Sequence, residues 1–240
     1  AGAREVYLID EPVAAAIGAS LPVTDPVGTM IVDIGGGTTE VAVLSLGGTV
    51  VSESLRIAGD EINESISSYL KKNHSMAVGE RTAEKIKIKI GSAFPDNNFD
   101  NTSFEVRGLH LSSGLPRSIT LTSGEIREAM ADPLNKIVEA IKRTLERTPP
   151  ELAADIVERG IMLAGGGALI RGMNDLVTKE TGIFTHIAEE PLLCVVNGCG
   201  KILEDFRKLK RIVDTIDLGT NSEDSVDYPD FAHKLTREVL

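Results

Sequence analysis

The sequence lacks tryptophan, and among its 240 residues it has few aromatic side chains and only two cysteines. Aromatic residues make up 4% of the chain, which argues against a surface that stacks nucleic-acid bases on aromatic rings. Cys194 and Cys199 cannot form a disulfide framework, and together with four scattered histidines they show no zinc-ligand spacing. We interpret them as ordinary residues and expect a reducing cytoplasm.

Long apolar runs and an excess of positive charge are also missing. No stretch approaches the ~18 consecutive apolar residues of a transmembrane helix, and the charged segment 1–12 does not resemble a signal peptide. The chain has 25 Lys and Arg against 36 Asp and Glu, a net charge of −11. Because phosphate backbones are bound by clustered Lys and Arg, this balance argues against nucleic acid as a partner. The length suggests one large domain or two small ones.

Strand-like and helix-like segments alternate along the chain, which indicates an α/β fold with antiparallel parts. The run 29–57 predicts three strands joined by tight glycine turns, which is an antiparallel meander. The other expected elements are a strand at 5–9, a helix after Pro12, a helix at 59–74, a polar loop at 94–101, short strands between 104 and 122, a helix that follows a capping box at Thr122 and Glu125 and is interrupted by Pro133, a helix at 149–160, a buried strand at 160–164 and a helix at 189–209.

The segment 79–91, GERTAEKIKIKIG, fits two kinds of secondary structure. Ile86, Ile88 and Ile90 alternate with lysines, which is the period of a strand. Ala83, Ile86 and Ile90 also lie on one face of a helix. We expect a helix, because the apolar stripe is then complete.

Two glycine triplets each follow a short buried run. Gly35–Gly37 follow 30–34, and Gly165–Gly167 follow 161–164. Backbone N–H groups without a neighbouring Cβ can approach an anion closely. The second triplet is expected to open a helix, whose N-terminus also favours phosphate. Neither triplet fits a Walker A loop or a GxGxxG fingerprint, so an ordinary tight turn is the alternative for each.

The neighbours of the first triplet favour a nucleotide over an ordinary turn. Asp33 precedes the triplet by two residues, and Thr38 and Thr39 follow it. A carboxylate, free amides and hydroxyls on one hairpin suit a polyphosphate that carries Mg²⁺.

Four segments occur in an order that resembles the actin/Hsp70/sugar-kinase ATPase superfamily. DIGGGTTEV resembles its second phosphate loop, IMLAGGGALIRGM its adenosine motif, and YLIDEPVAAAIG and EEPLLCVVNGCGKIL its two connecting helices. VDIGGGTTEVAVLSLGG and PPELAADIVERG are most similar to the MreB family of bacterial actin homologues, and the resemblance extends from residue 1 to about 205. It implies an actin-like ATPase fold of the ribonuclease H-like α/β class.

The resemblance also implies a division into subdomains IIA and IIB with part of IA. Residues 1–58 would hold the end of IA, the first connecting helix and the phosphate-loop meander of IIA. Residues 59–117 would form IIB, 118–210 the remainder of IIA, and 211–240 an acidic C-terminal tail. The first phosphate loop of the family is not found in this sequence, so we expect a C-terminal portion that holds half of the nucleotide cleft.

The resemblance further implies roles for single residues around ATP and Mg²⁺. Glu11 would orient the attacking water with the help of Thr38, and Asp33 would hold Mg²⁺ through water. As alternatives, Glu11 complements a helix dipole, Asp33 caps a turn and Thr38 is a plain strand residue. The other nucleotide-binding positions would be Gly35, Gly36 and Gly37, then Glu84, Lys85, Ile86 and Lys87, and finally Gly165, Gly166, Gly167 and Ala168.

The positions of Glu84 and Lys87 depend on the ambiguous segment. On a helix these two residues lie on one face and can contact the same ligand, whereas on a strand they would point to opposite faces. A solvated Lys/Glu face is the alternative without a ligand.

For the whole protein, the resemblance implies a cell-shape-determining ATP hydrolase that polymerises with itself. Its filaments would organise cell-wall synthesis at the inner face of the membrane, with RodZ and MreC as partners and membrane contact through parts absent here. The protein would be cytoplasmic and associated with that membrane face. The alternative is a non-polymerising ATPase of the Hsp70 or sugar-kinase type, with this segment acting only as a binding module.

Overall fold

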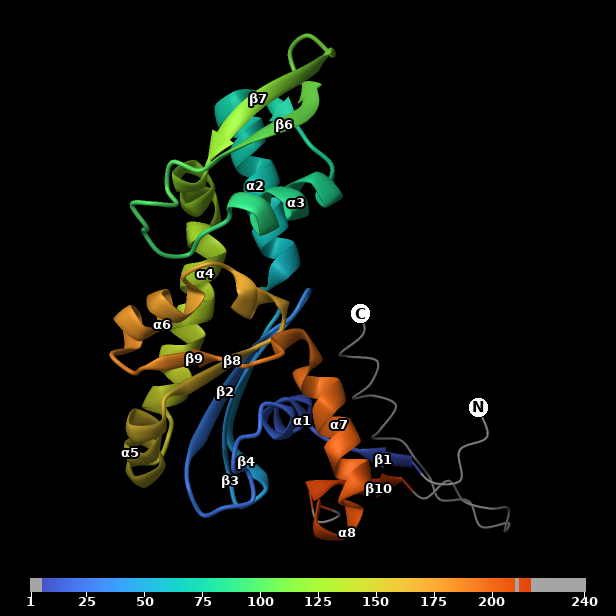
Figure 1. Cartoon of the computed structure of the whole chain (residues 1–240), viewed down its shortest axis with the longest axis vertical. Helices are drawn as coiled ribbons and strands as arrows, with labels where there is room; N and C mark the ends of the chain where they lie inside the picture. Colours follow the sequence, from blue (N-terminus) through green and yellow to red (C-terminus); the bar gives the residue numbers. More distant parts are fainter. Residues whose placement is uncertain (1–5, 210–211, 217–240) are drawn as a thin grey trace, which may run out of the picture. The chain divides into compact units, whose positions relative to one another are not determined.

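The computed structural model describes residues 6–209 and 212–216 (Figure 1). They fall into two units, and the smaller one contains strands β1 (Val6–Leu8) and β10 (Asp214–Ile216), which pair antiparallel. Strand β1 confirms the strand expected at 5–9. Strand β10 lies within the predicted acidic tail, and the rest of that tail, apart from 212 and 213, is outside the described residues.

The larger unit, 9–212, is built on a five-stranded sheet with the order β4-β3-β2-β8-β9. Strands β2 (Thr29–Ile34), β3 (Thr39–Ser45) and β4 (Gly48–Leu55) form the predicted antiparallel meander. Strands β8 (Ile161–Ala164) and β9 (Thr185–Ile187) continue the sheet in parallel to β2. Every residue of β2 is buried, because helices cover both faces of the sheet at this strand.

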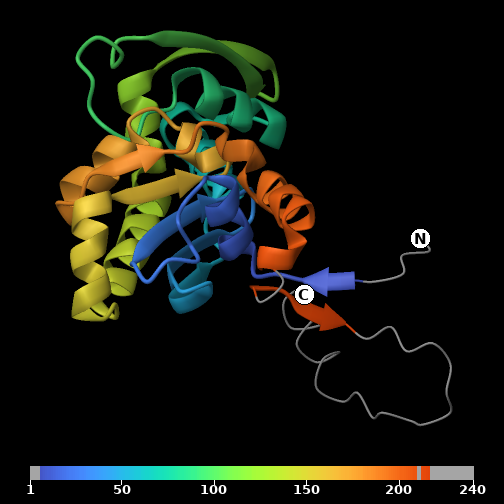
Figure 2. The same cartoon turned by 60° about the horizontal axis from the view of Figure 1, so that its bottom comes forward.

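Alternate residues of β2 point into two separate layers of packing. Met30, Val32 and Ile34 belong to the main core with Ile137 and Ile141 of helix α4 (Ser123–Glu146). Helices α4, α5 (Pro150–Arg159) and α6 (Met173–Thr181) lie on this side of the sheet, and α1 (Glu11–Gly18) and α7 (Cys194–Glu204) lie on the other (Figures 1 and 2).

Helices α1 and α7 cross with their backbones in contact. A Cβ atom on Gly18 would lie 1.7 Å from the carbonyl oxygen of Cys194, and one on Gly198 would lie 1.9 Å from that of Ala14. Lys201 of α7 donates hydrogen bonds to the carbonyl oxygens of Ile17 and Gly18, at 3.1 and 3.0 Å. It thereby satisfies acceptors that the end of α1 leaves free.

A second, three-stranded sheet of β5 (Met76–Ala77), β6 (Ser103–His110) and β7 (Pro116–Thr122) packs with α2 (Gly59–His74), α3 (Glu80–Ile90) and the start of α4. Helix α3 confirms the helical interpretation of 79–91. Ala83, Ile86 and Ile90 are buried, whereas Ile88 is 71% exposed. Burial of the apolar stripe on one helical face therefore decides the secondary structure of this segment, and the alternation of Ile and Lys does not.

Two local predictions were wrong and one was confirmed. Pro133 does not interrupt its helix, because α4 runs through it and buries Met130, Leu134 and Ile137 around it. The second glycine triplet opens only the 3₁₀ turn η1 (Gly166–Leu169), and α6 begins later, at Met173. The capping box is present, since Glu125 N–H donates to Thr122 Oγ1 at 3.4 Å and Thr122 N–H donates to Glu125 Oε2 at 2.9 Å.

The remaining short elements are η2 (Pro191–Leu193) and α8 (Phe206–Leu209), on either side of α7. Among the described residues, no helix combines the length and the apolar character needed to cross a membrane.

The crossing of α1 and α7 predicts opposite effects for two glycine-to-alanine changes on the same helix. Gly198→Ala should lower the free energy of unfolding by about 2–4 kcal/mol, because the new methyl group collides with the α1 backbone. Gly200→Ala should raise it by up to about 1 kcal/mol, because no atom lies within 4 Å of that position and alanine favours the helix. Urea denaturation of both variants tests this, and equal effects would contradict the backbone contact.

Candidate functional site

A cavity of about 670 Å³ opens in the larger unit where β2 and β8 end. These two strands are parallel neighbours, with Asp33 opposite Ala164. Parallel neighbours end at the same edge of a sheet, which is where ligands bind in open α/β folds. The two glycine triplets are far apart in the sequence but follow these strands, so both reach the cavity.

The first triplet forms a tight hairpin that supports the start of α2. Gly35 N–H donates to Thr38 O at 2.9 Å, which leaves Gly36 and Gly37 at the tip of the turn. The carbonyl oxygens of Gly35 and Gly36 accept hydrogen bonds from the N–H groups of Gly59 and Asp60, at 3.1 and 2.8 Å. Gly35 and Gly36 line the cavity, whereas Gly37 and Thr38 are exposed outside its lining.

The second triplet passes directly over the end of β2. Gly165 has φ +77°, and a Cβ atom there would lie 2.4 Å from Asp33 Oδ1. A Cβ atom on Gly167 would lie 2.2 Å from the Ile34 side chain. Only glycine fits at these positions. Gly165, Gly166 and Gly167 all line the cavity, and the buried Ala168 does not.

Negative charge collects at this edge of the sheet. Asp33 is 6% exposed, and burial raises its pKa to about 6, with further contributions from Glu11 and Glu40. Glu11 lies in the first turn of α1 and lines the same cavity as Asp33. None of the described Lys, Arg and His residues forms an ion pair with Asp33 or Glu11. The two carboxylates are therefore suited to a cation that the ligand brings.

Within the described ranges, no group of three or more His, Cys, Asp or Glu side chains has the arrangement of a complete metal site. Mg²⁺ still fits Asp33, because this ion keeps several waters and is usually bound by one or two carboxylates together with substrate phosphates.

Helix α3 contributes a second wall of the cavity. Glu84 and Lys87 both line it, as the helical spacing predicts. Lys87 Nζ donates to Gly59 O at 2.9 Å, and burial lowers the pKa of Lys87 while Glu84 and Asp60 act in the opposite direction. The side chains at the other two predicted positions on this helix do not line the cavity. Lys85 lies over the Phe104 ring, and Ile86 is fully buried.

Several cavity residues were not predicted from the sequence. Asp60 is the second residue of α2, beside the glycine hairpin, and no local pattern distinguishes it from an ordinary acidic residue in the first turn of a helix. The side chains of Ile88, Leu169 and Leu192 also line the cavity, although they are 71%, 58% and 67% exposed. Such exposed apolar side chains at a concave site are typical of a surface that covers the flat part of a ligand.

Comparison with known proteins gives consistent results. The family model described as MreB/Mbl protein matches residues 1–211. The chain is 56% identical over 204 residues to the cell shape-determining protein MreB of Escherichia coli K12, which is 85% of this chain and 58% of that protein. It is 46% identical over 210 residues to the cell shape-determining protein Mbl of Bacillus subtilis 168, which is 88% and 62% of the two chains. It thus spans about six tenths of these relatives.

Solved structures agree with this result. MreB5 of Spiroplasma citri bound to ADP superposes with a TM-score of 0.80 at 37% identity, over 84% of this chain and 61% of that one. The MamK double helical filament, at 22% identity and a TM-score of 0.65 over 82% and 59%, supports the fold alone. The expected actin-like α/β fold is confirmed, and the chain belongs to the MreB/Mbl family.

Proposed function

We propose that the cavity binds ATP with Mg²⁺, and that the protein carrying this chain hydrolyses ATP and polymerises into filaments that determine cell shape. The observation that carries the proposal is the meeting of two glycine loops over Asp33, beside Glu11, a second carboxylate that forms no ion pair among the described residues. The names of the relatives support the cellular role, and solved MreB5 structures bound to ADP and AMPPNP support the ligand.

The phosphate chain would lie between the two glycine loops. The backbone of Gly35–Gly37 would face the terminal phosphates, and that of Gly165–Gly167 would face the α-phosphate. Asp33 would hold Mg²⁺ through water, and the ion supplies neutralisation of the phosphate charge. The proposal is supported by the burial of Asp33 at a place where none of the described Lys, Arg and His residues forms an ion pair with it.

Glu11 is the proposed acceptor that orients the attacking water. Its carboxylate lines the cavity on the α1 side, and no Lys, Arg or His in the described part of the chain forms an ion pair with it. Phosphoryl transfer depends on positioning and charge neutralisation, so one well-placed acceptor is enough. Thr38 would assist from the exposed end of the hairpin.

The nucleoside would lie toward α3 and η1. Glu84 and Lys87 are the proposed contacts on the ribose side, and Ile88, Leu169 and Leu192 offer apolar surface to the base. We assign no contact to the side chains of Lys85, Ile86 or Ala168, because Lys85 lies over the Phe104 ring and the side chains of Ile86 and Ala168 are fully buried outside the cavity lining.

The cellular setting is proposed from the family alone. It comprises a cytoplasmic location at the inner face of the membrane, the organisation of cell-wall synthesis there, contacts with RodZ and MreC, and the division into subdomains IIA, IIB and part of IA. A non-polymerising ATPase of the Hsp70 or sugar-kinase type is not favoured, because the relatives at 56% and 46% identity are both named cell shape-determining proteins.

Removal of the Glu11 carboxylate should separate nucleotide binding from hydrolysis. In the natural protein that carries this sequence, Glu11→Gln should slow phosphate release by at least about a hundredfold, because the attacking water loses its acceptor. ATP-dependent pelleting should persist. Asp10→Asn is the matched control, since Asp10 is the preceding carboxylate and does not line the cavity. An unchanged rate in Glu11→Gln would remove this residue from the mechanism, and a wild type that neither pellets nor releases phosphate would contradict the proposed function.

The raised pKa of Asp33 predicts a pH-dependent stability. Folded Asp33 keeps its proton up to about pH 6, whereas an ordinary aspartate loses it near 3.8, so the free energy of unfolding falls as pH rises through this range. Asp33→Asn removes this loss. Without Mg²⁺ it should stabilise the protein by about 1–2 kcal/mol at pH 8, after allowance for screening by solvent, and have little effect at pH 4.

Urea denaturation at the two pH values measures the effect, and Asp175→Asn, on the exposed surface of α6, is the control. The same Asp33→Asn variant should lose the Mg²⁺-dependent part of its nucleotide affinity. Equal free energies of unfolding for Asp33→Asn and wild type at pH 8 would show that the ionised Asp33 carboxylate does not destabilise the fold.

A further inference from the structure

One part of the cavity wall has no role in the proposed phosphate chemistry. Phe99 and Arg171 both line the cavity, and the guanidinium carbon of Arg171 lies 3.9 Å from the centre of the Phe99 ring. This is a close stack of a cation on an aromatic face. The Arg171 side chain is nevertheless 55% exposed, so Phe99 covers only part of it.

The backbone fixes the position of this stack. Ser92 pairs with Arg171 in a parallel bridge, and Ala93 N–H donates to Arg171 O at 2.8 Å. Arg171 follows η1, the turn that begins within the glycine triplet above Asp33, and there it pairs with the start of the loop 91–101. The stack therefore lines the cavity but belongs to neither glycine loop.

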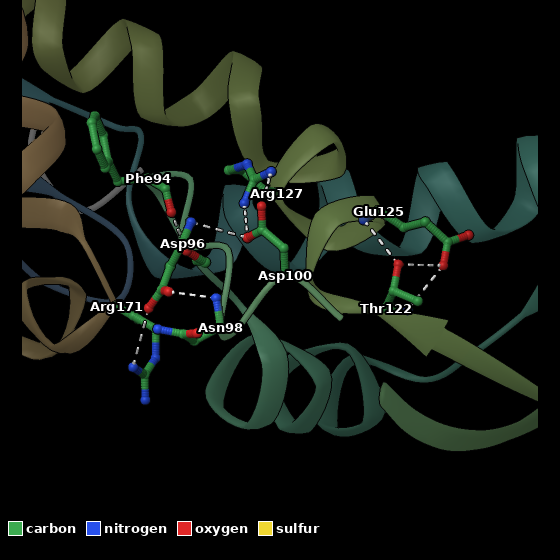
Figure 3. A network of polar contacts seen from close by, with 9 residues as sticks. Phe94, Asp96, Asn98, Asp100, Thr122, Glu125, Arg127 and Arg171 are labelled. Atoms are coloured by element: carbon green, nitrogen blue, oxygen red, sulfur yellow. Dashed lines mark hydrogen bonds and ion pairs between the residues drawn. The ribbon is translucent and has the colours of Figure 1, made fainter. Parts of the chain in front are cut away.

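Side chains hold the loop that presents Phe99. Asp100 forms two hydrogen bonds with the guanidinium of Arg127 on α4, one of them Nη2 to Oδ2 at 2.9 Å, and this contact lowers the pKa of the Asp100 carboxyl (Figure 3). Asp96 N–H donates to Asp100 Oδ1 at 3.2 Å, and Asp96 Oδ2 lies 4.0 Å from Arg171 Nη1. Phe99 is thus fixed between two anchored aspartates rather than free to leave the cavity.

We infer that Arg171 binds the nucleobase, which stacks on the open guanidinium face while Phe99 supports the opposite face. The inference rests on the proposed nucleotide-binding function and assigns a residue to the base. A guanidinium is planar and weakly hydrated, and it stacks on aromatic rings and on bases. An ammonium group has no plane to offer, so lysine is not equivalent at this position.

The alternative is that Arg171 acts only through its charge on the phosphates. The two roles predict different effects on the affinities for ligands with and without a base. A base-binding residue affects ATP but not inorganic tripolyphosphate, which has no base, whereas a phosphate-binding residue affects both.

The test is isothermal titration of the natural protein carrying this sequence with ATP and with tripolyphosphate, each with Mg²⁺. Arg171→Ala should lower the affinity for ATP by about tenfold and change the affinity for tripolyphosphate by less than about twofold. Arg171→Lys, which keeps the charge and loses the plane, should weaken ATP nearly as much. Phe99→Leu should also lower the affinity for ATP, by a smaller factor, because the guanidinium of Arg171 loses the ring on which it stacks.

Arg107→Ala is the control, because it removes one exposed positive charge from β6 outside the cavity. It should leave both affinities unchanged, and thermal denaturation should show that all variants remain folded. Equal losses for the two ligands in Arg171→Ala, full rescue of ATP binding by Arg171→Lys, or unchanged ATP binding in Arg171→Ala would each overturn the inference while the nucleotide site stands. A wild type that binds neither ligand would overturn the proposed function and the inference with it.

Discussion

The parallel pairing of β2 with β8 is the interaction on which the site depends. It aligns Met30–Asp33 with Ile161–Ala164 and ends both strands at one edge. The two glycine loops then begin side by side, although a helical layer and a second sheet separate them in the sequence. A shift of one residue in this register would reverse the facing of every β8 side chain and move Gly165 away from Asp33.

This pairing also imposes a cost at Asp33. The strand that carries it is buried along its whole length, so its last polar side chain is taken out of water beside Glu11 and Glu40. Burial of a carboxylate without a cation is unfavourable, and the chain tolerates it through the large apolar core on the other side of the same strand. The site thus carries strain that the surrounding packing holds in place.

Much of the local structure could be predicted because its signals are short-ranged. Apolar runs joined by glycine turns located the meander, periodicity placed Glu84 and Lys87 on one helical face, and the Thr/Glu spacing typical of a helix start located the Thr122 capping box. Propensity failed at Pro133, where apolar residues buried on both sides keep the helix continuous in spite of the missing N–H.

The part of the cavity wall formed by Phe99 and Arg171 could not be predicted from local patterns. Phe99 is in a polar loop and Arg171 follows a short turn, and the pairing of residues 92 and 93 with Arg171 brings them together. Asp60 is similar, because its place in the cavity comes from the hydrogen bonds between the start of α2 and the glycine hairpin. The proposal of ATP rests on resemblance to a family, since glycine triplets alone do not distinguish a phosphate loop from a turn.

The crossing of α1 and α7 has a mechanical consequence. Helices usually interlock through ridges and grooves of side chains, which fix the angle between their axes. Here Gly18 and Gly198 remove the ridges at the crossing, so backbone meets backbone there. Lys201 adds a tether beside the crossing, because its amino group reaches the end of α1 on a flexible four-carbon stem. Without interlocked ridges at that point, steric contacts limit the angle between the two helix axes less than in a pair packed through side chains, which is the property of a pivot.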